Sequence, residues 1–126
     1  MKKTIIEAER ETGIPSTRIR FWLKKGLFPE LETDKNGVRL FGDEDILKLK
    51  WIEWFRFVRM SLANIKQYMH LVSLGQKSTF QKRKKILETQ RELIIKDMQA
   101  TQEILSKIEE KIKFLDKQCR CNVSKK

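Results

Sequence analysis

The sequence contains no long apolar run and few of the residues on which membrane or disulfide-linked proteins depend. Its longest stretch free of Lys, Arg, Asp and Glu is the ten residues 67–76, whereas a helix needs about 20 apolar residues to cross a bilayer. The first residues lead into no signal-peptide core, so we expect a cytoplasmic protein without a membrane partner. The two cysteines, Cys119 and Cys121, lie one residue apart, a spacing that cannot staple a core.

Catalytic groups are scarce as well. The chain has a single histidine, His70, and it shows no glycine-rich phosphate loop and no Ser/His/Asp arrangement. Apart from the cysteine pair, no cluster of metal ligands appears along the sequence. We therefore expect that the protein is not an enzyme and that it holds no cofactor.

Positive charge is abundant, because 28 Lys and Arg residues outnumber 17 Asp and Glu residues and give a formal net charge of +11. Such a balance favours a polyanionic partner, either nucleic acid or an acidic membrane surface. With 40% hydrophobic residues, only 5 Gly and only 2 Pro, the 126-residue chain is too apolar and too regular to be disordered.

The residue composition of the sequence changes at Gly75. Residues 1–75 hold both prolines, every glycine and all aromatic residues except Phe80 and Phe114. Residues 76–126 have no Gly or Pro and show the periodicity of a long helix. We therefore predict two domains, a globular one over residues 1–75 and a helix with a short basic tail over residues 76–126.

Helix signals divide the first domain into a helix-turn-helix. Thr4 and Glu7 have the spacing of a capping box, and Gly13 stands where a short helix needs its end. Ser16 is expected to cap a second helix, which Gly26 closes. The two helices are thus joined by a tight turn, the arrangement of a helix-turn-helix.

A hairpin and two further helices are expected next. The segment 34–37 (DKNG) lies between residues 31–33 and the alternating stretch 38–41, and Asn-Gly before such a stretch is a strong hairpin signal. Three acidic residues at 43–45 suit the first turn of a third helix. Ser61 is the expected cap of a fourth.

Nothing interrupts a helix over residues 80–118, and apolar residues recur there in steps of four and three, the seam of a coiled coil. An exposed seam needs a partner, and the simplest is a second copy, antiparallel or parallel. We predict a mostly α fold: an N-terminal winged helix-turn-helix with a small β-hairpin wing, then a long C-terminal coiled-coil dimerisation helix. The seam residues predicted to form the homodimer are Ile94, Met98, Thr101, Leu105, Ile108, Ile112 and Leu115, with Cys119 continuing the stripe.

The second helix is the best candidate for reading DNA, because the segment 13–28 has four basic residues and no acidic one. On a helical wheel Ile19 and Leu23 fall on one side, which predicts that they pack against the domain. Cations beside aromatic rings suit the major groove and its phosphates. The alternative, which the spacing leaves open, is that the aromatic residues belong to the core. The residues expected on the outward face are Arg18, Phe21, Trp22 and Lys25.

The hairpin offers a second contact. Alternation puts Val38 and Leu40 on one side of the strand and Arg39 and Phe41 on the other. Arg39 is placed to reach a stretch of phosphate backbone, although a single hairpin Arg is also an ordinary solvated residue.

Three groups of motifs, in order, resemble MerR-family transcription regulators. Residues 12–14 (TGI), 20–22 (RFW) and 26–27 (GL) are similar to the opening of that family, residues 36–41 (NGVRLF) to its wing, and residues 60–62 (MSL) to a later signature. The resemblance implies a winged-helix homodimer that grips double-stranded promoter DNA and bends or untwists it. It thereby implies a sequence-specific transcriptional regulator that acts on RNA polymerase indirectly.

The resemblance also implies which residues contact DNA, and this sequence differs from the family's pattern at some positions. The family's usual Thr before its Leu-Arg pair is Arg18 here, and the Gly often found before the later signature is Arg59. Our helical wheel places Arg20 off the outward face, in tension with the family's Arg-aromatic pair. The residues predicted to bind DNA are Thr17, Arg18, Arg20, Phe21, Trp22, Lys25, Arg39 and Phe41.

Three alternatives accompany this interpretation. An architectural or chromosome-anchoring protein uses the same winged helix without controlling transcription. The basic run 82–85 (KRKK) is also compatible with a membrane surface, although the apolar seam is too narrow for that role. Cys119 and Cys121 lie where some metal-sensing relatives have cysteines, but two thiols are too few for a closed metal site. We expect no metal there, and a redox-active pair stays open.

Overall fold

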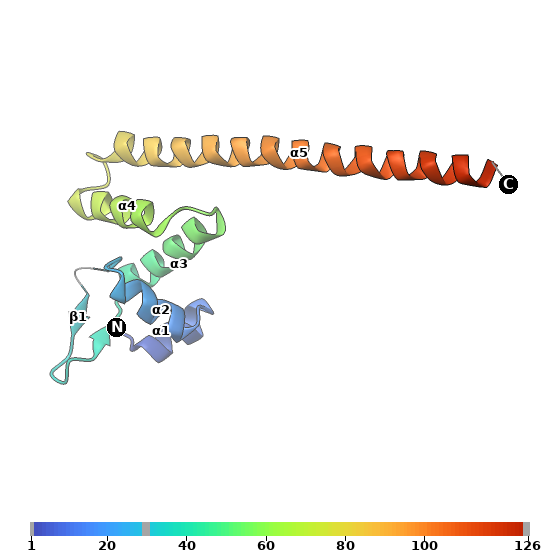
Figure 1. Ribbon diagram of the computed structural model, residues 1–126. Helices are drawn as coiled ribbons and strands as arrows, with labels where there is room; N and C mark the ends of the chain where they lie inside the picture. Colours follow the sequence, from blue (N-terminus) through green and yellow to red (C-terminus); the bar gives the residue numbers. More distant parts are fainter. Residues whose placement is uncertain (1, 29–30, 125–126) are drawn as a thin grey trace. The chain divides into compact units, whose positions relative to one another are not determined.

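The computed structural model describes residues 2–28 and 31–124, with side chains described up to Arg120. Four helices and a small hairpin precede one long helix (Figure 1). This order of elements confirms the predicted winged helix-turn-helix with a long C-terminal helix. The elements are α1 (Ile5–Thr12), α2 (Ser16–Lys24), β1 (Glu32–Thr33), β2 (Arg39–Leu40), α3 (Asp43–Phe57), α4 (Leu62–Leu74) and α5 (Phe80–Ser124).

The capping box predicted for α1 is present. The hydroxyl of Thr4 accepts a hydrogen bond from the Glu7 amide (3.4 Å), and the Thr4 amide donates to the Glu7 carboxylate (2.9 Å). The Thr4 amide and hydroxyl hydrogen bonds hold the pKa of that carboxyl below its ordinary value. Gly13 ends the helix with φ 76°, a left-handed conformation that glycine adopts without strain.

The start of α2 differs from our prediction. Pro15, and not Ser16, is the N-cap, and Ser16 is the first helical residue. The Ser16 amide donates to the Glu9 carboxylate of α1 at 2.6 Å. An acceptor from the preceding helix thus replaces the local serine cap, and it ties α1 to α2. Gly26, with φ 80°, ends the helix as predicted, and the Leu27 amide donates to the Trp22 carbonyl (3.1 Å).

The hairpin is short and antiparallel, with Glu32 opposite Leu40 and Thr33 opposite Arg39. Its turn is closed by Asp34, whose carboxylate accepts from the amides of Asn36 (2.8 Å) and Val38 (2.9 Å). Such a side-chain acceptor organises a turn that two short strands alone would not hold.

A third chain segment lies beside β2. Lys3 and Phe41 exchange two backbone hydrogen bonds of 2.8 and 2.7 Å. This isolated bridge attaches the chain before α1 to the residue that follows β2, at the base of the hairpin.

The core of the first four helices is apolar. The helices α1 and α2 contact each other, and α3 contacts both α1 and α4. Ser61 caps α4 as predicted, accepting from the Asn64 amide (3.1 Å). The most deeply buried large side chains are Ile14, Ile19, Trp22, Leu27, Phe41, Leu49, Ile52, Met60 and Ile65.

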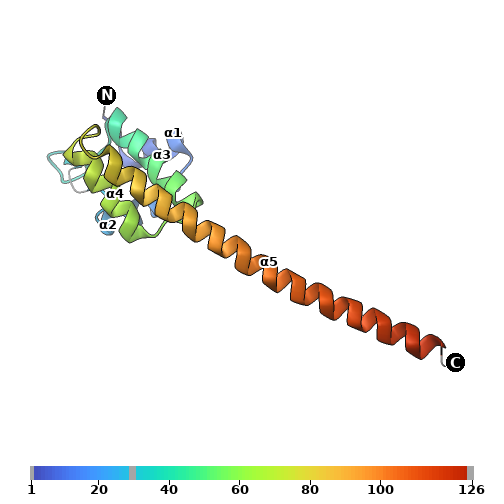
Figure 2. The same cartoon turned by 90° about the horizontal axis from the view of Figure 1, so that it is seen from above.

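The helix α5 has 45 residues, longer than the predicted 80–118, and at 1.5 Å per residue it extends roughly 68 Å (Figure 2). Contacts group Met1–Ile86 into one compact unit and Leu87–Lys126 into another. The functional boundary placed after residue 75 stays a prediction. Among the described helices, none has an apolar stretch sufficient to span a bilayer.

Candidate nucleic-acid interface

The exposed face of α2 is set by three buried residues on its other side. Ile19, Trp22 and Leu23 are buried, and at 100° per residue the opposite direction runs between Thr17 and Phe21, with Lys24 close to Thr17. After Ser16, the exposed residues of this helix and its C-cap are Thr17, Arg18, Arg20, Phe21, Lys24 and Lys25.

Trp22 does not lie on that exposed face, so our placement of this residue was wrong. Its side chain is only 2% exposed, whereas Phe21 next to it is 45% exposed. The helical wheel misplaced it because Ile19 and Leu23 alone do not define the full width of the packed side. With Trp22 included, the packed side turns toward Arg18 and the exposed side turns toward Arg20.

The corrected orientation of α2 places Arg20 and Lys24 on the exposed side of the helix. Arg20 is exposed, which removes the conflict between the wheel and the Arg-aromatic pair of the resembled family. Lys24 lies seven residues after Thr17, two helical turns along the same face, and it was absent from our predicted contacts. The spacing of seven was the sequence signal for it. Lys25 lies over the ring of Phe21, with its Nζ 5.5 Å from the ring centroid.

In the hairpin the predicted alternation holds for Arg39 and fails for Phe41. Arg39 is exposed opposite Thr33. Phe41 is fully buried and meets Phe28 edge to face, with 6.3 Å between the ring centroids. Our placement of Phe41 beside Arg39 on an outward surface was therefore wrong. The cause is tertiary, because the strand has already ended there and the segment around Lys3 lies alongside.

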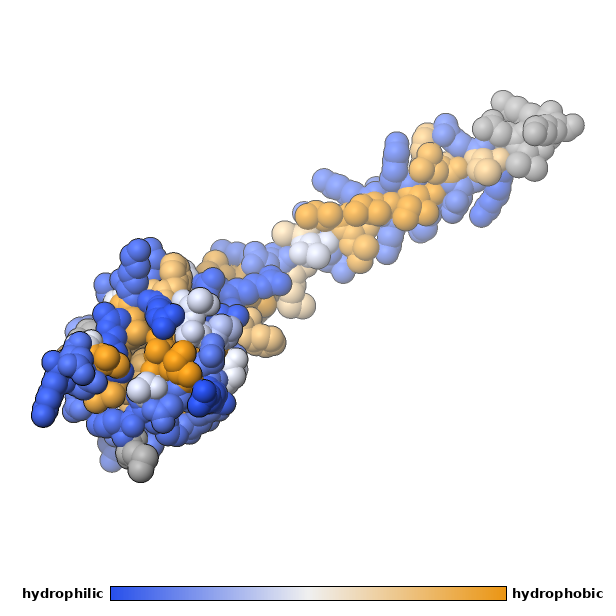
Figure 3. Space-filling view, turned by 90° about the horizontal axis from the view of Figure 1, so that it is seen from below, coloured by the Kyte–Doolittle hydropathy of each residue, from blue (hydrophilic) through white to orange (hydrophobic). Residues whose placement is uncertain are grey.

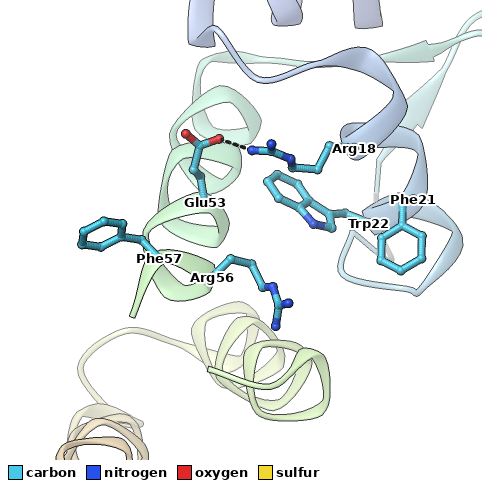
Figure 4. Close-up of a pocket in the computed structure, with 6 residues that line it drawn as sticks. All are labelled: Arg18, Phe21, Trp22, Glu53, Arg56 and Phe57. Carbon is cyan, nitrogen blue, oxygen red and sulfur yellow. Dashed lines mark hydrogen bonds and ion pairs between the residues drawn. The ribbon is translucent and has the colours of Figure 1, made fainter. Parts of the chain in front are cut away.

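Arg18 lies at the edge of α2 that faces α3. Its Nη1 donates to the Glu53 carboxylate of α3 at 3.3 Å (Figure 4). The two side chains border an open groove of about 480 Å³ between these helices. The lining residues are Arg18, Phe21, Trp22, Glu53, Arg56 and Phe57.

The predicted seam on α5 is exposed in the single chain. Met98 is 66% exposed, and Ile94 is partly covered. Figure 3 shows apolar side chains along the surface of this helix. The other apolar seam residues, each about half exposed, are Leu105, Ile108, Ile112 and Leu115, and Thr101 is exposed among them. A half-exposed row of large apolar side chains is unusual on an isolated chain and marks a contact surface.

The cysteines do not form a site that the structure describes. Cys119 is free and exposed. The side chain of Cys121 lies outside the described residues. Among the described residues, no group of three His, Cys, Asp or Glu side chains is arranged to hold a metal ion.

Comparison with known proteins adds an independent finding. The family model of the MerR HTH family regulatory proteins matches residues 3–71. A Haemophilus influenzae protein described as an uncharacterized HTH-type transcriptional regulator is 28% identical over 117 residues, covering 93% of this chain and 86% of its own length.

Two solved structures are also similar. A MerR-family transcriptional regulator from Bacillus thuringiensis has a TM-score of 0.66 and 30% identity, covering 89% of this chain and 97% of its own. HiNmlR, described as a MerR family regulator lacking the sensor domain and bound to promoter DNA, has a TM-score of 0.65 and 27% identity, covering 84% of this chain and 80% of its own. The family model covers more than half of the chain and the fold is shared, so this chain belongs to the MerR HTH family of transcriptional regulators.

Proposed function

We propose that this protein is a sequence-specific transcriptional regulator that binds double-stranded promoter DNA as a homodimer. The observation that carries the proposal is the exposed face of α2, whose cations and Phe21 point outward from a chain of this family. The similarity to HiNmlR, which was solved on promoter DNA, supports the same partner for this chain. We also propose that the protein is cytoplasmic, in keeping with binding to promoter DNA.

The proposed contacts divide by chemistry. Lys24 and Phe21 lie toward the centre of the exposed face, where the cation suits base edges and nearby phosphates and the ring suits thymine methyls and sugars. Arg20 lies at the margin opposite Arg18 and suits base edges and phosphates on that side. Arg18, Lys25 and Arg39 lie at the margins and suit the phosphate backbone. Trp22 and Phe41 stay outside the proposed contacts because they are buried. Their role is to support α2 and the hairpin from within.

The homodimer is proposed to form through α5. The exposed seam has the steps of four and three that allow two helices to interlock. Dimerisation would bring two recognition helices to one DNA site, which suits a site with two-fold symmetry. It would also bury the apolar row that the single chain exposes.

The proposed action on transcription is indirect. The family typically bends and untwists promoters with an over-long spacer so that RNA polymerase can use both promoter elements. Deforming DNA costs free energy that depends on its sequence, so specificity here would include that cost as well as base contacts. No catalytic step is part of the proposal, in keeping with a family of regulators.

The test is a selection of duplexes from a random library with the wild-type protein, followed by binding measurements on the selected duplex. We expect Arg20→Ala and Arg39→Ala each to weaken binding by about fivefold or more, because each removes a charge-assisted contact of about 1–3 kcal/mol. Arg120→Ala is the matched control, since it removes an exposed arginine of α5. Equal affinities for all three variants would reject the proposed contacts. In-vitro transcription from a promoter with the selected site then separates regulation from architectural binding, for which polymerase output stays unchanged.

A further inference from the structure

Arg18 is unusual among the cations of α2. Of the described basic residues in this helix, it alone has an acidic partner, Glu53 of α3. Arg20 and Lys24 make no ion pair in the described part of the chain. The sequence of α2 holds no acidic residue, so the carboxylate that pairs with Arg18 comes from another helix. Figure 4 shows the pair at the rim of the groove between α2 and α3.

The ion pair between Arg18 and Glu53 is weak enough for Arg18 to exchange Glu53 for a DNA phosphate. The side chains of Arg18 and Glu53 are 51% and 46% exposed, and a single nitrogen reaches a single oxygen at 3.3 Å. Ion pairs in such surroundings are weak because water and salt screen them. A DNA phosphate offers the guanidinium the same kind of anionic oxygen and can accept two parallel hydrogen bonds from it, a bidentate contact. Arg18 therefore has two alternative partners of the same chemistry.

The position of Arg18 on α2 determines when it can exchange Glu53 for a phosphate. Arg18 lies at the flank of α2, beside α3, whereas Thr17, Phe21 and Lys24 lie toward the centre of the exposed face. For a guanidinium at this flank, we expect contact with a phosphate only after the centre of the exposed face has entered the groove. DNA held by long-range attraction alone does not come that close, and non-specific complexes depend on such attraction.

We propose that Glu53 is a specificity-determining residue, which neutralises Arg18 until the recognition helix is seated on its own site. Random DNA then meets a face with one fewer available cation per protomer than the specific site does. The inference rests on the proposed function, because it concerns how that DNA surface discriminates between sequences.

Glu53→Gln is the central variant, because glutamine keeps the size of the side chain and removes its charge. Arg18 is then free to bind any DNA. We expect the salt dependence of binding to a scrambled duplex to steepen by about 0.9 per protomer, the value for one additional phosphate contact. The ratio of affinities for the selected and scrambled duplexes is expected to fall at least threefold.

Two further variants make the result specific. Glu44→Gln makes the same change in net charge on the same helix, at an exposed residue that forms no ion pair in the described part of the chain, and should leave the affinity ratio unchanged. Arg18→Gln should reduce the salt dependence on the selected duplex by about 0.9 per protomer and leave that on the scrambled duplex unaltered. In the Arg18→Gln background, Glu53→Gln should no longer lower the ratio.

The outcomes separate this inference from the proposed function. If the wild-type protein selects no sequence from the library, both fail. If it selects one but Glu53→Gln and Glu44→Gln give the same affinity ratio, the role of Glu53 is rejected and the DNA-binding function stands. A fall in the ratio that persists without Arg18 also rejects it, since Glu53 would then repel phosphates by itself.

Discussion

Phe21 and Trp22 are neighbours in the chain and occupy opposite environments. Trp22 is 2% exposed and helps to close the core between α2 and the rest of the domain, whereas Phe21 is 45% exposed beside Lys25. A buried tryptophan contributes more apolar contact area than any other single side chain of a small core. An exposed phenylalanine contributes little to folding, which leaves it available for a partner.

This contrast leads to a prediction for a matched pair of variants. We expect Trp22→Ala to lower the free energy of unfolding by about 3–5 kcal/mol, because it leaves a large cavity. Phe21→Ala should lower it by less than about 1 kcal/mol, as expected for an exposed site, and should instead weaken binding to the selected duplex. Urea denaturation followed by circular dichroism measures both stabilities. Equal losses would contradict the assignment of these two residues to different environments.

At the scale of the elements, the junction between α3 and α4 holds a conformation that its sequence does not favour. Arg59 has φ 66°, the only positive φ of a non-glycine residue in the described chain. It stands where the resembled family often has glycine. The Cβ atom of a non-glycine residue makes this left-handed conformation costly, typically by about 1–2 kcal/mol. The junction is held nonetheless, because the Arg56 guanidinium donates to the Met60 carbonyl (2.8 Å) and Ser61 caps the next helix.

The strain at Arg59 is testable by substitution. We expect Arg59→Gly to raise the free energy of unfolding by about 0.5–1 kcal/mol, the relief of strain less the entropy that glycine adds to the unfolded chain. Arg59→Ala removes the same charge and keeps the Cβ, so it should leave stability nearly unchanged. Thermal and urea unfolding of the two variants provide the comparison. An alanine variant as stable as the glycine variant would show that charge, and not backbone conformation, governs this site.

At the scale of the whole molecule, net charge is a poor guide to the DNA surface. Residues 1–75 carry 14 basic and 10 acidic side chains, whereas residues 76–126 carry 14 and 7. Most of the excess therefore lies outside the proposed DNA-binding domain. One basic residue of the run 82–85 turns inward: Arg83 donates to the Tyr68 hydroxyl (3.3 Å) and to the Thr79 hydroxyl (3.0 Å). That run is thus less available to a membrane surface than its sequence indicates.

The seam of α5 carries the prediction for the assembly. We expect Ile108→Lys to convert the homodimer to a monomer at micromolar concentration, because a buried, unpaired charge in a dry helix interface is strongly unfavourable. Ser106→Lys places the same side chain on the opposite face of α5, where it should leave the mass unaltered. Sedimentation equilibrium measures both. A dimer that persists in Ile108→Lys with the wild-type affinity would show that another surface forms the homodimer.

Much of the fold could be predicted because its signals are local. The capping box of Thr4 and Glu7, the Asn-Gly turn and the cap at Ser61 each depend on residues within four positions of one another. The uninterrupted periodicity after Gly75 likewise specified α5 without reference to the rest of the chain. The motifs of residues 12–62 were sufficient to indicate the family, which the family model over residues 3–71 confirms.

Tertiary contacts decided what local patterns left ambiguous. Glu9, seven residues away, replaced Ser16 as the acceptor at the start of α2. The chain before α1 lies beside the end of β2, where the Phe41 ring is buried against Phe28. A helical wheel or a strand alternation describes one element at a time, and it cannot state which neighbour covers a given side.

The sequence by itself therefore determined the elements, their order, the family and the cationic character of α2, because these follow from spacing and capping along the chain. Only the tertiary structure decided which side of α2 is exposed and that Arg18 is paired with Glu53. Those outcomes depend on groups 35 residues apart being brought together by packing. The surface proposed to face DNA is thus specified by the core behind it, whose buried Trp22 and Phe41 orient the residues that remain outside.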